Sequence, residues 1–371
     1  MCENKLTKSL FNESKLANIK VKNRFVRSAT WENMTTEDGH LTKELYNIYE
    51  DLSKNEVGLI ITGYGNIVKE EQPNPGMMGI YDDSFINEYK KLTSIVHSYD
   101  SKIIMQLAYG GTKTKFNLGD RIIYAPSEVP ERSTNVLGKA MTKDEINYIV
   151  NDFAKAGKRV KDSGFDGVEI HGAHTYLINQ FLSPYYNRRT DEYGGSLENR
   201  MRFLIEIYYK MREMVGEDFP IFVKLTATEF FDGGLTFEET KLICKKLESI
   251  GINGIEISGN VHGKAKLMVG QVFDGLELKK EGYFLEYAKI ISNIVNIPII
   301  TVGGFKELDN IAKVFNETNI SYFGLSRPLL AEPNLIKRWK DGDTKPAKCV
   351  RCSKCRTPEG NYCTIFNKCT F

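Results

Sequence analysis

Eight short apolar segments, each followed by a stretch with helical periodicity, constrain the fold of this chain most. The segments are rich in Ile and Val and hardly alternate with polar residues, as expected of parallel strands buried on both faces. They are Arg24–Ser28, Val57–Thr62, Lys102–Leu107, Gly167–His171, Pro220–Leu225, Gly254–Ser258, Pro298–Val302 and Ser321–Ser326. Eight such units favour an α/β fold, the (β/α)8 TIM barrel. An open doubly wound sheet is disfavoured because no Gly-x-Gly-x-x-Gly turn follows a strand.

Two of the repeated units are alike in detail. Thr142 with Glu145, and Thr236 with Glu239, have the capping-box spacing that begins a helix. After each helical stretch comes a Gly stop and then a similar strand, Gly-Val-Glu-Ile-His-Gly from residue 167 and Gly-Ile-Glu-Ile-Ser-Gly from residue 254. This internal repetition of a βα unit is typical of a barrel.

Length and composition bound the class of protein. A chain of 371 residues can hold two or three domains, but an α/β barrel often uses this much chain as one. We expect a barrel over residues 1–346 and a Cys-rich extension over residues 347–371, which holds five of the seven cysteines. A net charge of +2 disfavours a nucleic-acid binder. Because no apolar run approaches a membrane span or a signal peptide, we expect a cytoplasmic protein without a membrane partner. The sequence leaves open whether the protein forms a homo-oligomer.

Polar residues gather at the ends of the predicted strands, where (β/α)8 barrels carry their reactive groups. The polar residues are Gln106, His171, His174, Lys224, Ser326 and Arg327, and the turns after the late strands also contain Gly303 and Gly304. Turns after the seventh and eighth strands often bind phosphate through backbone N–H groups. Two neutral imidazoles can hold a developing oxyanion, whereas a zinc site would need further ligands nearby. Tyr176 could either supply a proton in a reaction or serve only as a packing residue. The long connections Asn117–Met141 and Leu182–Asn199 are expected to carry function.

Two adjoining segments resemble a known family. His171–Pro184 and Asn187–Arg200 are similar to the sequence signature of the old yellow enzyme family of FMN-dependent ene-reductases. Further matches follow in the right order: Val21–Ala29, Gly58–Ile61, Met105–Ala108, Tyr124–Ser127 and Gly324–Leu330. The resemblance covers about residues 8–340.

The resemblance implies a barrel that holds FMN at its mouth. The flavin would be reduced by NAD(P)H or by a partner protein, and its N5 would pass hydride to an α,β-unsaturated carbonyl compound. His171 and His174 match the pair that binds the substrate carbonyl oxygen, where two aimed donors stabilise negative charge. Tyr176 matches the proton donor to the α-carbon, and Gln106 matches the amide at the pyrimidine edge of the flavin.

The resemblance also assigns the remaining flavin contacts. Lys224 stands where many relatives have arginine, and its charge would stabilise the reduced flavin near N1 and O2. The expected phosphate-binding residues are Gly303, Gly304, Ser326 and Arg327. Ala29 is expected to contact the flavin. An ungapped match places Trp31 beside the flavin and a one-residue shift places Thr30 there, so both stay open; Trp31 is also expected to contact substrate.

The C-terminal cysteines form a separate pattern. Cys349, Cys352, Cys355 and Cys363 resemble the iron–sulfur segment of larger relatives of the dienoyl-CoA reductase and trimethylamine dehydrogenase type, with shorter spacing. Four thiolates at such spacing can ligate a [4Fe–4S] cluster. They can equally bind zinc, or remain unliganded thiols.

The favoured function is an FMN-dependent oxidoreductase that reduces the carbon–carbon double bond of an activated alkene. An NADH oxidase, or a flavin-linked dehydrogenase or demethylase on the same barrel, is the alternative within the enzyme class. A flavin-free lyase could instead use Lys224 as a Schiff-base nucleophile. A barrel without catalysis is disfavoured because His171, His174, Tyr176 and Gln106 are all present.

Overall fold

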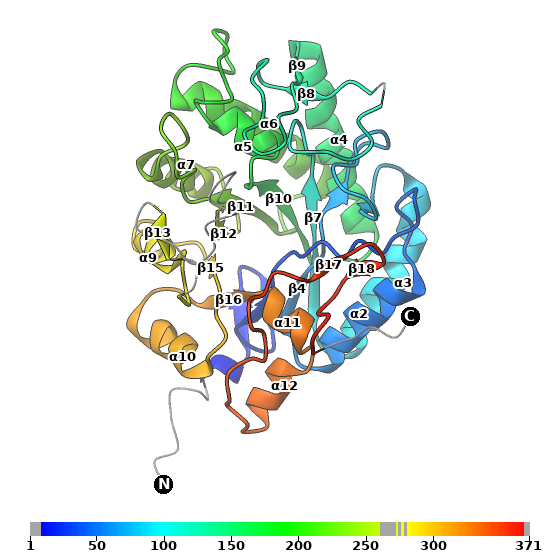
Figure 1. The fold of residues 1–371 in the computed structure, drawn as a ribbon, viewed down its shortest axis with the longest axis vertical. Helices are drawn as coiled ribbons and strands as arrows, with labels where there is room; N and C mark the ends of the chain where they lie inside the picture. The colour runs from blue at the N-terminus through cyan, green and yellow to red at the C-terminus, as the bar shows by residue number, and fades with distance from the viewer. Residues whose placement is uncertain (1–8, 120, 260–271, 274–275, 278–279, 367–371) are drawn as a thin grey trace.

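In the part of the chain that the structure describes, eight parallel strands close into a barrel (Figure 1). The structure is a computed structural model that describes residues 9–119, 121–259, 272–273, 276–277 and 280–366. The strands are β3 (Phe25–Arg27), β4 (Leu59–Ile61), β7 (Lys102–Ala108), β10 (Gly167–Gly172), β11 (Ile221–Thr226), β12 (Gly254–Ser258), β15 (Ile299–Thr301) and β16 (Tyr322–Leu325). Each falls on a segment expected from the sequence, and β16 pairs with β3 to close the ring. The predicted TIM barrel is confirmed.

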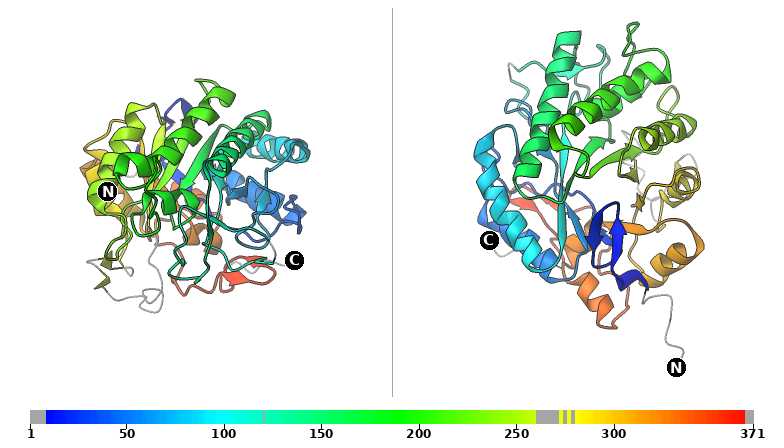
Figure 2. Two further views of the ribbon diagram at one scale, coloured as in Figure 1. Left: turned by 90° about the horizontal axis from the view of Figure 1, so that it is seen from above. Right: turned by 180° about the vertical axis from the view of Figure 1, so that it is seen from behind.

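Helices follow the strands and cover the outside of the barrel (Figures 1 and 2). They are α2 (Lys43–Lys54), α3 (Ile86–Ser98), α4 (Lys143–Asp162), α6 (Leu197–Val215), α7 (Phe237–Ser249), α9 (Leu285–Ser292), α10 (Leu308–Glu317) and α12 (Leu335–Lys340). Their apolar faces pack on the strands and form the main hydrophobic core. Burial of this layer fixes the strands, and hence the positions of their ends.

The two predicted capping boxes begin α4 and α7. In α4 the Thr142 hydroxyl accepts the Glu145 N–H at 3.2 Å, and the Glu145 carboxylate accepts the Thr142 N–H at 2.8 Å. Thr236 and Glu239 repeat the arrangement in α7. Gly164 and Gly251 follow the two helices with φ of +80° and +98°, a backbone region that favours glycine. The helix boundaries expected from the sequence are therefore confirmed.

A short hairpin closes the barrel at the end opposite the site. It consists of β1 (Ser14–Leu16) and β2 (Ile19–Val21), and η1 (Ser9–Phe11) precedes it. Leu16, Ile19 and Val21 pack against side chains inside the barrel, such as Ile104 and Phe222. The hairpin is seen from behind in Figure 2. Because this end is filled by apolar side chains, ligands are restricted to the opposite mouth.

The loops hold shorter elements. They are β5 (Gly65–Asn66), β6 (Met78–Gly79), η2 (Asp83–Phe85), β8 (Tyr124–Ala125), β9 (Lys139–Ala140), α5 (Leu177–Leu182), β13 (Val272–Phe273), β14 (Leu276–Glu277), α11 (Arg327–Ala331), β17 (Arg356–Thr357) and β18 (Gly360–Asn361). The β17–β18 hairpin belongs to the Cys-rich extension and docks on the barrel, since the Asn361 side chain donates to the Trp31 carbonyl at 2.6 Å. The domain boundary at residue 346 stays a prediction.

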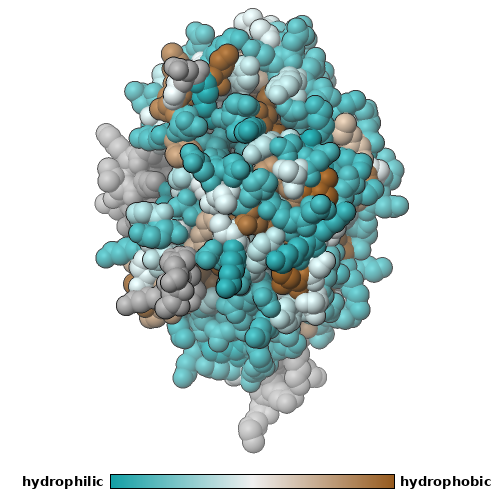
Figure 3. Space-filling model, turned by 90° about the vertical axis from the view of Figure 1, so that its right-hand side faces the viewer, coloured by the Kyte–Doolittle hydropathy of each residue, from teal (hydrophilic) through white to brown (hydrophobic). Residues whose placement is uncertain are grey.

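The surface on the side of α2 and α3 is mostly hydrophilic, with small apolar patches scattered over it (Figure 3). Within the described ranges, no helix has both the length and the apolar character needed to cross a membrane.

Thr142→Ala removes the hydroxyl that caps α4, and we expect it to lower the free energy of unfolding by about 1 kcal/mol. Urea denaturation followed by circular dichroism measures the change. Asn147→Ala, at an exposed position of the same helix, is the matched control and should cause no loss. Equal stability of the two variants would contradict the capping role.

Candidate functional site

A cavity of ≈ 230 Å³ opens at the mouth of the barrel. It is lined by seven of the catalytic, substrate-binding and cofactor-binding residues expected from the sequence, namely Ala29, His174, Lys224, Gly303, Gly304, Ser326 and Arg327. Cys349 and Arg351 of the C-terminal extension also line it. Thr30, Trp31, Gln106, His171 and Tyr176 lie outside this lining. The cavity therefore joins the ends of the early and the late strands.

One end of the cavity suits an anion. Gly303 and Gly304 have φ of +126° and +79°, and a Cβ on Gly304 would lie 2.8 Å from the Tyr283 ring. Side chains are thus excluded there, and the backbone itself forms the wall. Arg327 and Arg351 bring two guanidinium groups to this end, and Arg351 donates to the Gly304 carbonyl. Backbone and guanidinium donors together are the groups that bind phosphate.

The opposite part of the site has a buried polar floor. Lys224 Nζ lies 3.0 Å from Glu256 Oε1 and 3.1 Å from Ser28 Oγ. On the neighbouring strands, Gln106 Nε2 donates to Glu169 Oε1 at 2.5 Å. Burial, and then the adjacent Glu256, raise the pKa of Glu169 well above its usual range. The amide and the ammonium are therefore held in fixed orientations by buried carboxyl groups.

Sequence reasoning missed Glu169 and Glu256, although the sequence holds a signal for them. Both occupy the same place in the repeated unit, as the second residue before the polar residue that ends the strand. Each has one carboxyl oxygen that is buried without a hydrogen-bond partner in the described structure. An acid repeated at the same depth in two buried strands indicates a shared interior role.

The two histidines lie side by side. Their ring centroids are 5.0 Å apart and their planes are nearly perpendicular. His171 Nδ1 accepts the Ala173 N–H at 3.3 Å, which leaves the ring proton on Nε2. Burial lowers the pKa of His171 well below its usual range, and His174 and Lys224 lower it further, so the ring is neutral. His174 Nε2 lies 2.9 Å from Ser258 Oγ, a residue that sequence reasoning had placed only at a strand end.

Tyr176 belongs to a cluster of phenols. Its ring centroid lies 4.9 Å from that of His171 and 5.5 Å from that of Tyr64. Asn74 Nδ2 donates to Tyr64 Oη at 2.7 Å and to Tyr176 Oη at 3.2 Å. Burial raises the pKa of Tyr176 to about 12, while hydrogen bonds with Tyr64 and Asn74 act in the opposite direction. Asn74 was missed because it lies in a loop far from Tyr176 in sequence.

The backbone beside these groups is strained. His174 and Thr175 have φ of +60° and +58°, a region rare for residues other than glycine and rarer for β-branched ones. The hydrogen bonds that hold the segment include those from His174 N–H to Thr226 Oγ1 (3.1 Å), from Thr175 N–H to Asn179 Oδ1 (2.8 Å) and from Gln180 Nε2 to the Thr175 carbonyl (2.6 Å). The strain is thus fixed by side chains that themselves are buried.

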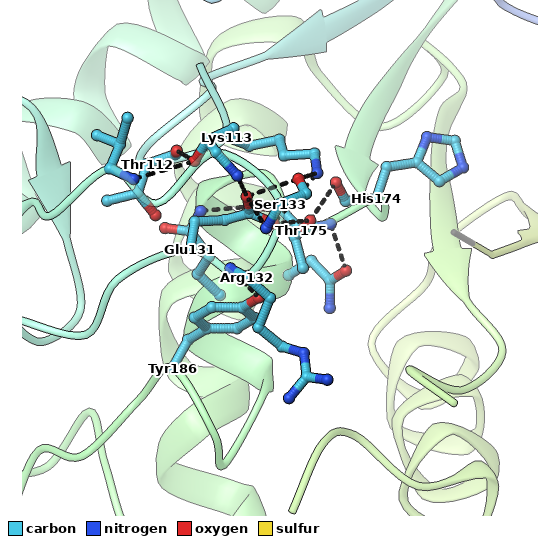
Figure 4. A network of polar contacts seen from close by, with 12 residues as sticks. Thr112, Lys113, Glu131, Arg132, Ser133, His174, Thr175 and Tyr186 are labelled. Carbon is cyan, nitrogen blue, oxygen red and sulfur yellow. Dashed lines mark hydrogen bonds and ion pairs between the residues drawn. The ribbon is translucent and has the colours of Figure 1, made fainter. Parts of the chain in front are cut away.

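A polar network ties the long loop after β7 to this segment (Figure 4). Its centre is the buried carboxylate of Glu131, which lies 3.1 Å from Lys113 Nζ and accepts the Ser133 N–H at 2.8 Å. Thr175 Oγ1 also contacts Glu131, at 3.4 Å. The loop expected to carry function is therefore connected to the backbone that carries His174.

Thr30 and Trp31 point to different neighbours. Thr30 Oγ1 lies 2.8 Å from Ser326 Oγ, at the late strands. Trp31 donates its indole N–H to the Pro75 carbonyl at 2.8 Å, and the Arg356 guanidinium lies over its ring. Which of the two contacts a cofactor stays a prediction.

The four described cysteines of the extension, Cys349, Cys352, Cys355 and Cys363, lie near one another. Cys349 and Cys363 are buried against Ala331. Burial, and then Cys363, Cys349 and Cys352, raise the pKa of Cys355. Among the described residues, no group of three or more His, Cys, Asp or Glu side chains is placed to hold a metal ion. The geometry gives no support to the predicted iron–sulfur or zinc site.

Comparison with known proteins places this geometry among flavin enzymes. Residues 9–345 match the model of the NADH:flavin oxidoreductase / NADH oxidase family. The chain is 35% identical over 349 residues to an NADH oxidase of Thermoanaerobacter brockii, covering 93% of this chain and 53% of that protein. It is 31% identical over 392 residues to a cinnamate reductase of Clostridium sporogenes, covering 96% and 57%.

The similarity extends to solved structures. A complex of 2-naphthoyl-CoA reductase with 2-naphthoyl-CoA superposes with a TM-score of 0.84 at 26% identity, covering 92% of this chain and 54% of that one. The chain spans about half the length of these relatives.

Glu71, whose charge raises the pKa of Tyr176, can be used to test how burial near the site changes the pKa of a carboxyl group. It accepts the Gly110 N–H at 3.0 Å and lies 3.9 Å from Arg121, yet burial raises its pKa from 4.5 to about 7. A carboxyl whose pKa is higher in the folded than in the unfolded state stabilises the fold at low pH. That contribution is lost as the pH rises through about 7.

Glu71→Gln removes this titration and keeps an acceptor for Gly110. We expect the stability of the variant relative to wild type to rise by up to about 3 kcal/mol between pH 4.5 and 8. Urea denaturation across this range measures the difference. Glu70→Gln, an exposed neighbour, should keep a constant difference from wild type. A pH-independent difference for Glu71→Gln would refute the assignment.

Proposed function

The chain belongs to the NADH:flavin oxidoreductase / NADH oxidase family, and from this premise we propose that it reduces the double bond of an α,β-unsaturated carbonyl compound with FMN and NAD(P)H. The observation that carries the proposal is the pair of adjacent imidazoles, His171 and His174, with the buried phenol of Tyr176 packed against His171. The similarity to a cinnamate reductase, an enzyme named for an unsaturated acid, supports the same reaction class.

The residues around the cavity fit FMN. Its phosphate would be held by the backbone of Gly303 and Gly304 with Ser326 and Arg327, because these groups form the cationic end of the cavity. The ring system would face the polar floor, where Lys224 and Gln106 present an ammonium and an amide. Ala29 would form a further wall, and Thr30 lies just behind the lining, 2.8 Å from the Ser326 hydroxyl. When bound, FMN supplies the hydride chemistry that the side chains lack.

The imidazoles would bind the carbonyl oxygen of the substrate. Reduction of the alkene places negative charge on this oxygen, and a neutral His171 can donate its Nε2 proton as a hydrogen bond without transferring it. His174 would supply the second donor, oriented by Ser258 and by the strained backbone. Donors fixed before the reaction stabilise developing charge without the cost of reorganisation.

Tyr176 would donate the proton that completes the reduction. A phenol with a pKa of about 12 is fully protonated at neutral pH and so is poised as a donor. Once the proton leaves, the Tyr176 oxygen carries negative charge, which the amide of Asn74 and the phenol of Tyr64 stabilise. We therefore assign Tyr64 and Asn74 to the support of Tyr176.

Two alternatives are distinguishable. Oxidation of NADH with oxygen as the acceptor uses the same barrel, and the similarity to an NADH oxidase favours it as the second candidate. A Schiff-base lyase needs an uncharged lysine, but Lys224 is ion-paired with Glu256 at 3.0 Å, so the structure disfavours it. Direct assay must decide whether NADH, NADPH or a partner protein donates the electrons. It must also decide whether the four cysteines bind a metal.

Protein purified with FMN is expected to be yellow and to bleach when NADH or NADPH is added under nitrogen. Adding 2-cyclohexenone without oxygen should restore the flavin absorbance, which stopped-flow spectrophotometry measures. Bleaching that is reversed by oxygen but by no enone, enoate or nitroalkene would favour the NADH oxidase. Protein that binds no FMN would refute both. Iron and sulfide analysis of the same sample tests the cysteines.

Tyr176→Phe removes the proposed proton donor but keeps the ring. We expect reoxidation of the reduced flavin by an enone to slow by about 100-fold or more, with little change in flavin reduction by NAD(P)H. Stopped-flow measurement separates the two half-reactions.

Tyr64→Phe is the graded comparison. It removes one hydrogen bond to Tyr176, and we expect a loss of about 10-fold in the same half-reaction. An unchanged reoxidation rate in Tyr176→Phe would remove its role as donor.

A further inference from the structure

The β17–β18 hairpin of the C-terminal extension has a fixed place at the barrel mouth. The backbone N–H of Asn361 donates to the Glu32 carbonyl at 2.7 Å, and its side chain donates to the Trp31 carbonyl at 2.6 Å. From the barrel side, Asn33 Nδ2 donates to the Thr357 carbonyl at 3.3 Å. Figure 1 shows the hairpin in front of the barrel. The extension thus contributes side chains to the loop that follows β3.

Arg356 is the residue that this docking presents to the mouth. Its guanidinium carbon lies 5.6 Å from the centroid of the Trp31 ring, and the ring is itself fixed by its bond to the Pro75 carbonyl. A cation–π contact holds a guanidinium but uses none of its five N–H donors. Within the described ranges Arg356 forms no ion pair, in contrast to Arg351, which lies 3.8 Å from Glu281.

The charge of Arg356 acts on the phenols of the proposed active site. Burial raises the pKa values of Tyr64 and Tyr176, and Arg356 opposes this effect at both. Tyr176 in turn contacts His171, one of the proposed carbonyl donors. The geometry agrees: Arg356 stacks on Trp31, Trp31 is bonded to the Pro75 carbonyl, and the preceding residue, Asn74, donates to both phenols.

We propose that Arg356, stacked on Trp31, binds an anionic group of the substrate, a carboxylate or a phosphate, at a position remote from the reacting carbonyl. The inference rests on the proposed function and narrows its substrate class to unsaturated carbonyl compounds with an acidic substituent. Arginine suits this role because its planar donors match both oxyanions, and the aromatic ring fixes its orientation. Trp31 would then act on the substrate through Arg356.

The test uses substrates that differ only in charge. The neutral member is 4-phenylbut-3-en-2-one, and the anionic members carry a carboxylate or a phosphate ester at the para position of the phenyl ring. We expect wild type to have a lower KM for an anionic member than for the neutral one. Whether the carboxylate or the phosphate compound has the lower KM identifies the anionic group that Arg356 binds. Arg356→Gln should raise KM for that member by about 10-fold or more, while KM for the neutral substrate stays nearly unchanged.

Lys354→Gln is the matched control, because it removes the same charge from an exposed position two residues away. It should leave the preference intact, and added salt should weaken the preference in wild type but not in Arg356→Gln. Equal KM values for neutral and anionic members in wild type, or equal effects of Arg356→Gln on both, would overturn the inference and leave the proposed function standing.

Equilibrium dialysis of the same compounds against the FMN-loaded protein, without NAD(P)H, measures binding independently of turnover. If an anionic member binds more tightly than the neutral one, and Arg356→Gln loses this difference, the anion site is supported. Failure of the enzyme to reduce either compound would refute the proposed reaction but not the anion site. Equal affinity of neutral and anionic members overturns the site.

Discussion

Closure of the barrel is the constraint on which the rest of the structure depends. The β10 strand pairs with both β7 and β11, and β16 pairs with β3, so every strand end opens on the same mouth. Ser28 and Lys224 are 196 residues apart in sequence, yet their side chains are hydrogen-bonded at 3.1 Å. Because the apolar hairpin fills the other end, the polar residues of all strands can be used only at this mouth.

Inside the closed barrel, the burial of ionisable side chains costs free energy, which the rest of the fold must offset. Lys224, Glu169 and Glu256 are almost fully buried, and burial of unpaired charge is strongly unfavourable. The Lys224 ammonium is paired with Glu256, and burial and then Glu256 raise the pKa of Glu169 well above its usual range. The arrangement fixes the orientation of the side chains that face the cavity. Direct pairing with hydrogen bonds makes such a floor rigid, which suits the binding of a planar ring system.

The sequence predicts those parts of the molecule that depend on local pattern. Strands follow from apolar runs, helix ends from capping residues and glycines, and the histidine pair from its place after a strand. It does not predict the support of Tyr176, because Asn74 lies 102 residues away in a loop without periodicity. Arg356 was missed for a similar reason: its position depends on hydrogen bonds between the extension and residues 31–33. The cysteine spacing suggested a metal site that the geometry does not support.

The strained segment at His174 and Thr175 connects the local backbone conformation to the geometry of the candidate site. A left-handed conformation at residues other than glycine costs about 1–3 kcal/mol each, and it persists only where the surroundings determine it. Here the surroundings are the side chains of Asn179, Gln180 and Thr226, with Glu131 contacting the Thr175 hydroxyl from the long loop after β7. The position of an imidazole that would bind the carbonyl thus depends on a loop that borders the site. Changes in that loop would therefore alter both the room for substrate and the geometry of its activation.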